Sequence, residues 1–205
     1  SVGVVALVVC VAGVPAVARA QSGERRLADA AKDADWGVVR ALLEQGADVG
    51  TPQGDGTTAL HWASYWDDAD SADLLIRAGA DVDAANDLGV TPLWTACENG
   101  SAAMVERLLQ AGASPNAALL SGETLLMMAA HTGNAEIIEQ LLVGGAEADA
   151  TERARGQTAL MWAVGQHHAD VVEVLLAHDA DVHARSTVWT EVVKTTLEPW
   201  NHPDY

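Results

Sequence analysis

Apolar and polar positions along this chain follow a pattern that recurs about every 33 residues. Four segments share glycine, then threonine, then an apolar run: GTTALHWA (56–63), GVTPLWTA (89–96), GETLLMMA (122–129) and GQTALMWA (156–163), with starts 33, 33 and 34 residues apart. A second series keeps the same phase: LLEQGAD (42–48), LIRAGAD (75–81), LLQAGAS (108–114), LLVGGAE (141–147) and LLAHDAD (175–181). Two series with one period indicate an internal repeat, in which each period is one structural unit.

Each period predicts two helices joined by a turn. A threonine that can cap a first helix stands directly before each apolar run: Thr58, Thr91, Thr124 and Thr158. Apolar residues at helical spacing predict the second helices: Val38, Val39, Leu42 and Leu43; Met104, Val105, Leu108 and Leu109; Ile137, Ile138, Leu141 and Leu142; Val171, Val172, Leu175 and Leu176. Left-handed helix stops are predicted at Gly46, Gly79, Gly112 and Gly145, with Asp179 in the last unit. Stacking of the units would bury one continuous core.

The repeat resembles a known family. TALH (58–61) and TPLW (91–94) resemble the Thr-Pro-Leu-His signature of ankyrin repeats, and Gly-Ala-Asp resembles the ending of the ankyrin second helix. The resemblance covers roughly residues 25–186. It implies an all-α solenoid of stacked helix-turn-helix units joined by β-hairpin-like loops.

We expect five repeats, at residues 25–53, 54–86, 87–119, 120–153 and 154–186. The first lacks the signature and carries a polar set of residues, as an N-terminal cap does. Residues 187–205 break the pattern, so we expect an irregular insertion or tail there, in a truncated chain whose repeats continue beyond it.

The first twenty residues, SVGVVALVVCVAGVPAVARA, form an apolar stretch that ends in Ala18-Arg19-Ala20. This pattern is typical of a secretory signal peptide with its cleavage site, although the basic start and the initiator Met are missing. The alternative is an uncleaved anchor, because about 18 apolar residues can just span a bilayer. Two glycines and a proline in the stretch favour cleavage. We therefore expect a periplasmic or secreted protein with no membrane contact after cleavage.

The chain is strongly acidic, with 29 Asp and Glu against 11 Lys and Arg and a net charge of −18. Removal of residues 1–20 takes away only Arg19, which makes the net charge −19. Phosphate backbones and anionic membrane surfaces attract proteins of the opposite sign, so nucleic acid is not an expected partner. The charge favours a basic protein partner.

No catalytic residue, cofactor site or metal site is predicted. Gly-rich phosphate loops and His-Glu-x-x-His are absent. His167 and His168 are separated from His178 and His183 by a predicted helix of about ten residues, about 15 Å long, which is too far for shared zinc coordination. By repeat register, His61 is predicted to make structural hydrogen bonds with Thr58 and neighbouring backbone, as the resemblance implies. Cys97 falls at a small buried position, which predicts a packed thiol.

Three large aromatics stand out in a chain with no Phe and two Tyr. Trp62, Tyr65 and Trp66 have the i, i+3, i+4 spacing of one helix face, and Asp67, Asp68 and Asp70 follow as a predicted acidic rim. The resemblance places Tyr65 and Trp66 on the concave groove, where ankyrin repeats contact partners, and Tyr and Trp are common interface anchors. The alternative for Trp62 is packing between repeats. The other predicted partner-binding residues are Glu98, Asn99, His131 and Thr132 in the groove, and Asp87, Leu88 and Val90 in a loop.

The sequence thus predicts a non-catalytic protein–protein interaction module that binds through its groove and finger loops. Two alternatives stay open: an adaptor or substrate-binding part of a larger enzyme whose catalytic domain lies beyond residue 205, and a structural spacer. A spacer would tolerate loss of Tyr65 and Trp66. An enzyme would show a domain without repeats in the full-length gene. The oligomeric state is not predicted.

Overall fold

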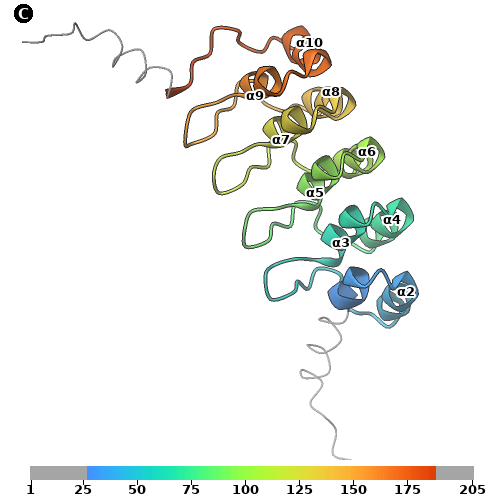
Figure 1. The fold of residues 1–205 in the computed structure, drawn as a ribbon. Coiled ribbons are helices and arrows are strands. Elements are labelled where there is room, and N and C mark those ends of the chain that lie inside the picture. The colour runs from blue at the N-terminus through green and yellow to red at the C-terminus, as the bar shows by residue number, and fades with distance from the viewer. Residues whose placement is uncertain (1–26, 188–205) are drawn as a thin grey trace, which may run out of the picture.

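The computed structural model describes residues 27–187, which form helix pairs stacked into an elongated solenoid (Figure 1). The helices after the helical residues 27–32 are α2 (Trp36–Glu44), α3 (Ala59–Tyr65), α4 (Ala69–Arg77), α5 (Pro92–Glu98), α6 (Ala102–Gln110), α7 (Leu125–Thr132), α8 (Ala135–Val143), α9 (Ala159–Gln166) and α10 (Ala169–Ala177). The predicted signal segment, and the predicted tail after residue 187, lie outside the described residues.

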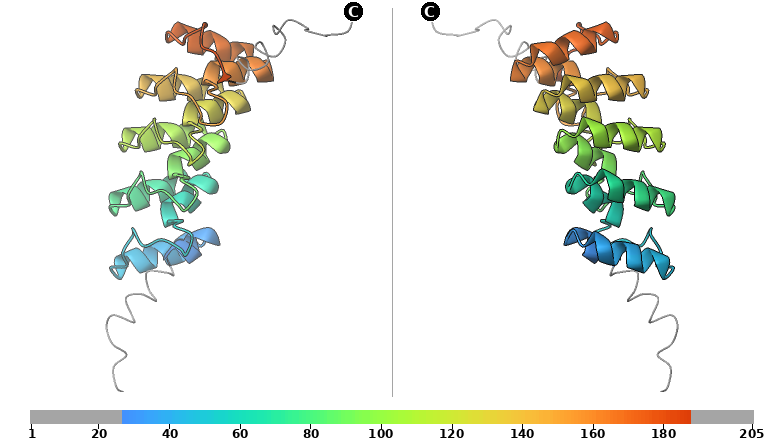
Figure 2. Two further views of the ribbon diagram at one scale, coloured as in Figure 1. Left: turned by 90° about the vertical axis from the view of Figure 1, so that its left-hand side faces the viewer. Right: turned by 90° about the vertical axis from the view of Figure 1, so that its right-hand side faces the viewer.

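The helices form two rows. In the first row α3, α5, α7 and α9 pack in succession, and in the second row α4, α6, α8 and α10 do the same. Two opposite side views, each turned by 90° from that of Figure 1, show the pairs as successive layers (Figure 2). Long loops project from the first row, on the side away from the second (Figure 1). We call these loops fingers, and they turn at Gly56, Gly89, Gly122 and Gly156. The predicted all-α solenoid is confirmed.

Side-chain caps define where the helices begin. The hydroxyl of Thr91 accepts a hydrogen bond from the Trp94 N–H at 3.2 Å, and Thr124 and Thr158 cap α7 and α9 in the same way. Side chains also cap α2, α4, α6 and α8, from Asp35, Asp68, Ser101 and Asn134 respectively. Each cap satisfies an N–H group that the helix cannot satisfy internally. The threonine caps of the first-row helices were predicted from the repeat pattern.

The core runs without interruption through the stack. Leu75, Leu108, Leu141 and Leu175 recur once per repeat and are fully buried, as are the small Ala63, Ala96, Ala129 and Ala163 beside which first-row helices pack. Burial of one leucine contributes about 1.5–3 kcal/mol. Val38 and Leu176, predicted on the buried faces, are instead 42% and 43% exposed. Both lie in the repeats at the two ends of the described stack. Among the described residues, no further repeat packs against them.

Each finger is a tight hairpin-like turn. In the first, the Gln53 N–H donates to the Thr57 carbonyl at 2.8 Å, and Gly56 turns with φ +84°. A Cβ at Gly56 would lie 2.9 Å from the Asn86 Cα, so only glycine fits there. The fourth finger contains the extra residue of the 34-residue period. In it the buried Glu152 carboxylate accepts backbone hydrogen bonds at 2.5–3.1 Å from Ala154, Arg155 and Gln157.

Backbone hydrogen bonds join neighbouring fingers. The Asp87 N–H donates to the Asp55 carbonyl at 2.9 Å, and the Arg153 N–H donates to the Ser121 carbonyl at 3.1 Å. Within the described residues, no backbone bond of this kind joins the fingers that turn at Gly89 and Gly122. The row of fingers is therefore joined unevenly along the stack.

Candidate protein-binding surface

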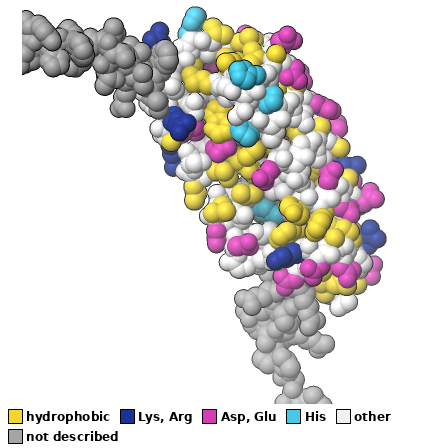
Figure 3. Space-filling view, viewed as in Figure 1, with side chains coloured by type: hydrophobic (Ala, Val, Ile, Leu, Met, Phe, Trp, Pro, Cys, Tyr) yellow, Lys and Arg dark blue, Asp and Glu magenta, His cyan; other side chains and the backbone are white. Residues whose placement is uncertain are grey.

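The predicted aromatic face of α3 forms a cluster of three rings, which we call the aromatic cluster: Trp62, Tyr65 and Trp66. The Trp62 and Tyr65 ring centroids are 5.6 Å apart, and those of Tyr65 and Trp66 are 5.1 Å apart, both in edge-to-face geometry. Tyr65 is 52% exposed and Trp66 is 48% exposed, whereas Trp62 is half-buried. Hydrophobic side chains gather on this face toward the N-terminal end of the stack (Figure 3). The cluster is thus an apolar surface that its own chain covers only in part.

Trp62 has a structural role as well as an exposed side. Its indole packs against the core, and its Nε1 donates a hydrogen bond to the Gln53 Oε1 at 3.0 Å. The Gln53 amide in turn donates to the Asp29 carboxylate at 2.7 Å, which reaches the preceding repeat. The position of the Trp62 ring is therefore fixed by two hydrogen-bonded side chains and by packing.

Lys32 of the preceding repeat completes the surroundings of the cluster. Its carbonyl accepts a hydrogen bond from the Trp66 Nε1 at 3.1 Å, and its Nζ lies 5.7 Å from the centre of the Trp62 ring. An ammonium at this distance is attracted by the π face of an indole. Lys32 was missed in the sequence, although a signal exists: it precedes Trp66 by 34 residues, about one repeat.

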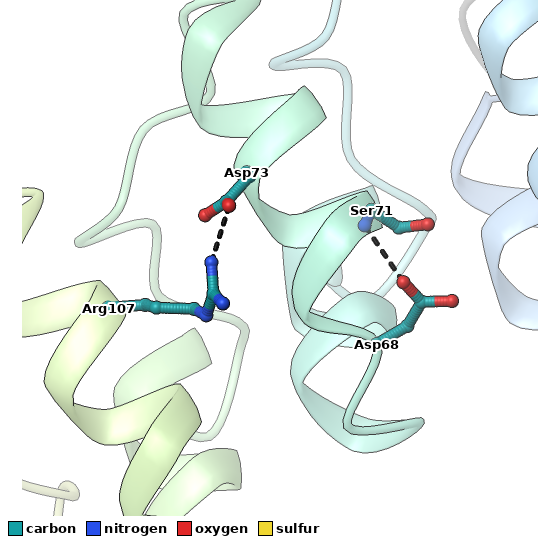
Figure 4. Close-up of polar contacts among 4 residues, drawn as sticks. All are labelled: Asp68, Ser71, Asp73 and Arg107. Carbon is teal, nitrogen blue, oxygen red and sulfur yellow. Dashed lines mark hydrogen bonds and ion pairs between the residues drawn. The ribbon is translucent and has the colours of Figure 1, made fainter.

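Two of the three residues of the predicted acidic rim also make structural hydrogen bonds. Asp67 adopts a left-handed conformation, with φ 52°, and accepts a hydrogen bond from the Ser101 hydroxyl at 2.5 Å. Asp68 caps α4 by accepting the Ser71 N–H at 2.8 Å (Figure 4). Asp70 carries an exposed carboxylate in the first turn of α4. The negative charge remains, but its positions follow from the requirements of the turn.

A pocket of about 160 Å³ opens between α3 and the first two fingers. Its lining residues are Asp55, Thr57, His61, Trp62, Tyr65, Asn86, Val90 and Thr95. Hydrogen bonding by the Thr57 backbone N–H, at 3.0 Å, holds the pKa of the Asp55 carboxyl below its usual range. The pocket therefore combines two aromatic side chains with an ionised acid.

His61 at the edge of this pocket is structural, as predicted. Its Nδ1 accepts the Thr58 backbone N–H at 3.1 Å, so its Nε2 carries the proton and donates to the Val90 carbonyl at 2.9 Å. Burial lowers the pKa of His61, which keeps the ring neutral. His61 thus joins two repeats and adds no positive charge to the pocket.

The remaining predicted partner-binding residues divide into free and engaged side chains. Glu98 is exposed at the end of α5, and Asp87 and Leu88 are exposed in the second finger. His131 is exposed at the end of α7, but its ring packs edge-to-face against Trp162 with the ring centroids 5.8 Å apart. Asn99 is exposed as well, and its amide donates to the Ser64 and Tyr65 carbonyls at 3.1 and 2.9 Å. Thr132 donates its hydroxyl to the Ala129 carbonyl, and Val90 is half-buried against the core.

The histidines and the cysteine are placed as the repeat register predicted. His167 and His168 lie at the turn before α10, and His178 lies at its other end, where its Nε2 is 2.9 Å from Glu139. No group of three potential metal ligands forms among residues 27–187. Cys97 is fully buried, and burial raises the pKa of its thiol to about 12. The described part of the chain holds no helix with the length and apolarity to cross a membrane.

A stack of helix pairs with a row of fingers along one side defines a helical repeat protein of the solenoid class. The family model for ankyrin repeats (3 copies) matches residues 27–119 and 113–186, which is more than half of the chain. The chain belongs to the ankyrin repeat family. A search against curated proteins returned no match. Ankyrin repeats are in general protein–protein interaction modules without catalytic activity of their own.

Proposed function

We propose that this protein recognises a protein partner through the aromatic cluster and the finger tips beside it. The observation that carries the proposal is the exposure of Tyr65 and Trp66, about half of each side chain, in direct ring contact. By contrast Trp94, in the next repeat, is only 3% exposed. Exposed aromatic groups of this kind commonly act as anchors at protein interfaces.

The finger tips extend the proposed surface beyond the cluster. Leu88 is 68% exposed at the tip of the second finger, and Asp87 beside it is joined to the first finger by a backbone hydrogen bond. An anchor in the groove with exposed residues at the rim matches the usual arrangement of interfaces, in which a few buried aromatics carry most of the binding energy.

The proposal is tested with a double substitution, Tyr65→Ala with Trp66→Ala, in a capture experiment from the native cell envelope and medium. We expect the double variant to lose a partner that the unchanged protein captures, with a small change in Tm. Val143→Ala is the matched control, because Val143 is an exposed apolar residue, 73% exposed, at the end of α8 in the second row. Equal capture by the unchanged protein, the double variant and Val143→Ala would favour a structural spacer. A large fall in the Tm of the double variant would show that the aromatic cluster is part of the core.

We also propose that the protein is exported. The support is the apolar segment 1–20 with its Ala18-Arg19-Ala20 ending. Fractionation of the native cells, followed by N-terminal sequencing, is expected to find a chain beginning at Gln21 in the periplasm or medium. Retention of the segment in a membrane fraction would favour the anchor, and an unprocessed chain in the cytosol would overturn export.

A further inference from the structure

We infer that the pocket between Asp55, Trp62 and Tyr65 receives the cationic end of a lysine or arginine side chain of the partner. The inference rests on the protein-binding function proposed above, and it names the chemistry of the partner at that surface. The aliphatic stem of the partner side chain lies against the two rings, and its charged end lies beside the Asp55 carboxylate.

The pocket has the composition that such a side chain requires. Its volume of about 160 Å³ admits the end of one long side chain, and its lining includes one carboxylate but no lysine or arginine. The neutral His61 supplies no competing positive charge, since both of its ring nitrogens are engaged by backbone groups. Aromatic faces attract ammonium and guanidinium groups, and a nearby carboxylate adds to that attraction.

Repeat register shows that this combination occurs in one repeat alone. The position of Asp55, directly before the finger glycine, is Leu88, Ser121 and Arg155 in the following repeats. The position of Tyr65 is Glu98, His131 and Gly165 in the same order. Asp55 supports its own finger by accepting the Thr57 N–H, as Ser121 does for the Glu123 N–H in the third finger. The equivalent positions in the following repeats carry neither a carboxylate in place of Asp55 nor a tyrosine in place of Tyr65. An acid and an aromatic ring are therefore a specific feature of this pocket.

Lys32 shows that the Trp62 ring accommodates a cation. Its Nζ lies 5.7 Å from the Trp62 centroid. The ion pairs among the described residues are Arg107–Asp73 and His178–Glu139, so Lys32 has no carboxylate partner there. Its ammonium is placed by the aromatic ring rather than by an acid. A partner cation in the pocket would gain the Asp55 carboxylate and the Tyr65 ring, against the repulsion of the Lys32 ammonium on the Trp62 ring.

The test uses the full chain and three small probes: N-acetyl-arginine amide, N-acetyl-lysine amide and the neutral N-acetyl-citrulline amide. Dissociation constants are measured by NMR from the indole N–H signals. We expect the arginine probe to bind at least about threefold more tightly than citrulline, the size of effect typical of exposed cation–aromatic and ion-pair contacts. Added salt is expected to reduce this preference through screening.

Two variants locate the effect. Asp55→Asn keeps an oxygen that can accept the Thr57 N–H, and it is expected to remove most of the preference for arginine over citrulline. Glu173→Gln removes the same charge from an exposed position on α10 and is expected to leave the preference unchanged. Tyr65→Leu, which keeps the side chain apolar, is expected to weaken both cationic probes severalfold. It supplies the test if Asp55→Asn disturbs the finger.

Equal binding of arginine and citrulline, or equal effects of Asp55→Asn and Glu173→Gln, would overturn the inference. Its failure is distinguishable from failure of the protein-binding proposal. If the probes show no charge preference while the Tyr65→Ala/Trp66→Ala variant still loses its partner, the pocket assignment fails and the binding surface stands. If the probes show the charge preference but the Tyr65→Ala/Trp66→Ala variant captures as much partner as the unchanged protein, the pocket chemistry stands and the protein-binding proposal fails.

Discussion

At the scale of single residues, equivalent repeat positions serve different purposes according to what surrounds them. His61, Trp94 and Met127 occupy the same position in successive repeats, and all three are buried. His61 carries two polar ring nitrogens, and these bond to Thr58 and to the Val90 carbonyl of the next finger. A histidine at this position therefore adds a polar link between repeats that an apolar side chain cannot form.

The buried His61 predicts a pH dependence of stability. Burial lowers its pKa in the folded state from the ordinary value of 6.5, so the unfolded chain binds protons more readily. The contribution of His61 to stability is therefore full above pH about 6.5 and is lost as pH falls from there through the lower folded pKa. We expect the Tm of the protein to fall over this range. In His61→Gln, which cannot titrate, Tm should start lower but fall less.

Comparing the pH dependence of Tm in the unchanged protein and in His61→Gln isolates the effect of His61, because the other histidines and the carboxylates are common to both. Thermal unfolding followed by circular dichroism between pH 8 and pH 5 is sufficient. Parallel curves for the two proteins would mean that His61 does not carry the pH dependence.

At the scale of the element, the acidic turn at Asp67 and Asp68 caps the start of α4 in addition to placing negative charge beside the aromatic cluster. Asp68 caps α4 by accepting the Ser71 N–H. Asp73 lies within α4 and forms an ion pair with Arg107 of α6 (Figure 4). The aspartates of this segment thus differ in what they stabilise. Loss of a cap and loss of an exposed charge should therefore have separable effects.

We expect Asp68→Ala to lower the free energy of unfolding by about 1 kcal/mol, because it leaves an N–H at the start of α4 without its partner. Asp70→Ala removes an equal charge from the first turn of the same helix and should cost only about 0.3–0.5 kcal/mol, the size of an exposed helix-dipole interaction. Urea unfolding of both variants measures the difference. Equal losses would assign the effect to charge rather than to capping.

At the scale of the whole molecule, the repeat pattern predicted the stack well because each unit is specified by its own residues. The threonine caps, the glycine stops and the buried leucines all depend on contacts within one unit or with a neighbouring unit of the same repeat pattern. The contacts that sequence reasoning missed cross between repeats. Lys32 with Trp66, and Asn99 with the Tyr65 carbonyl, depend on the offset between stacked units. The hydrogen bonds of Asp67 with Ser101 and of Asp68 with Ser71 were not predicted either.

The last described repeat is predicted to be the least protected. His168 begins α10 without a side-chain cap, and Asp179 adopts φ 63° where the other repeats have glycine. A left-handed conformation costs a residue other than glycine about 1 kcal/mol or more. We expect amide hydrogen exchange to be at least about tenfold faster in α10 than in α6, since 1.4 kcal/mol of local stability corresponds to a factor of ten.

Asp179→Gly restores the residue found at the equivalent positions and should slow exchange in α10 without changing α6. Equal protection of the two helices in the unchanged protein would show that the caps do not set local stability in this stack.

The uneven joining of the fingers has a mechanical consequence. The first two fingers are tied by the Asp87–Asp55 backbone bond and by His61, whereas the next pair lacks a backbone bond within the described residues. We therefore expect the joint between the repeats that contain Gly89 and Gly122 to bend more readily than the joint beside the aromatic cluster. If the aromatic cluster binds a partner as proposed, the cluster lies on the stiffer part of the solenoid, and the part beyond it would adjust its curvature to the partner.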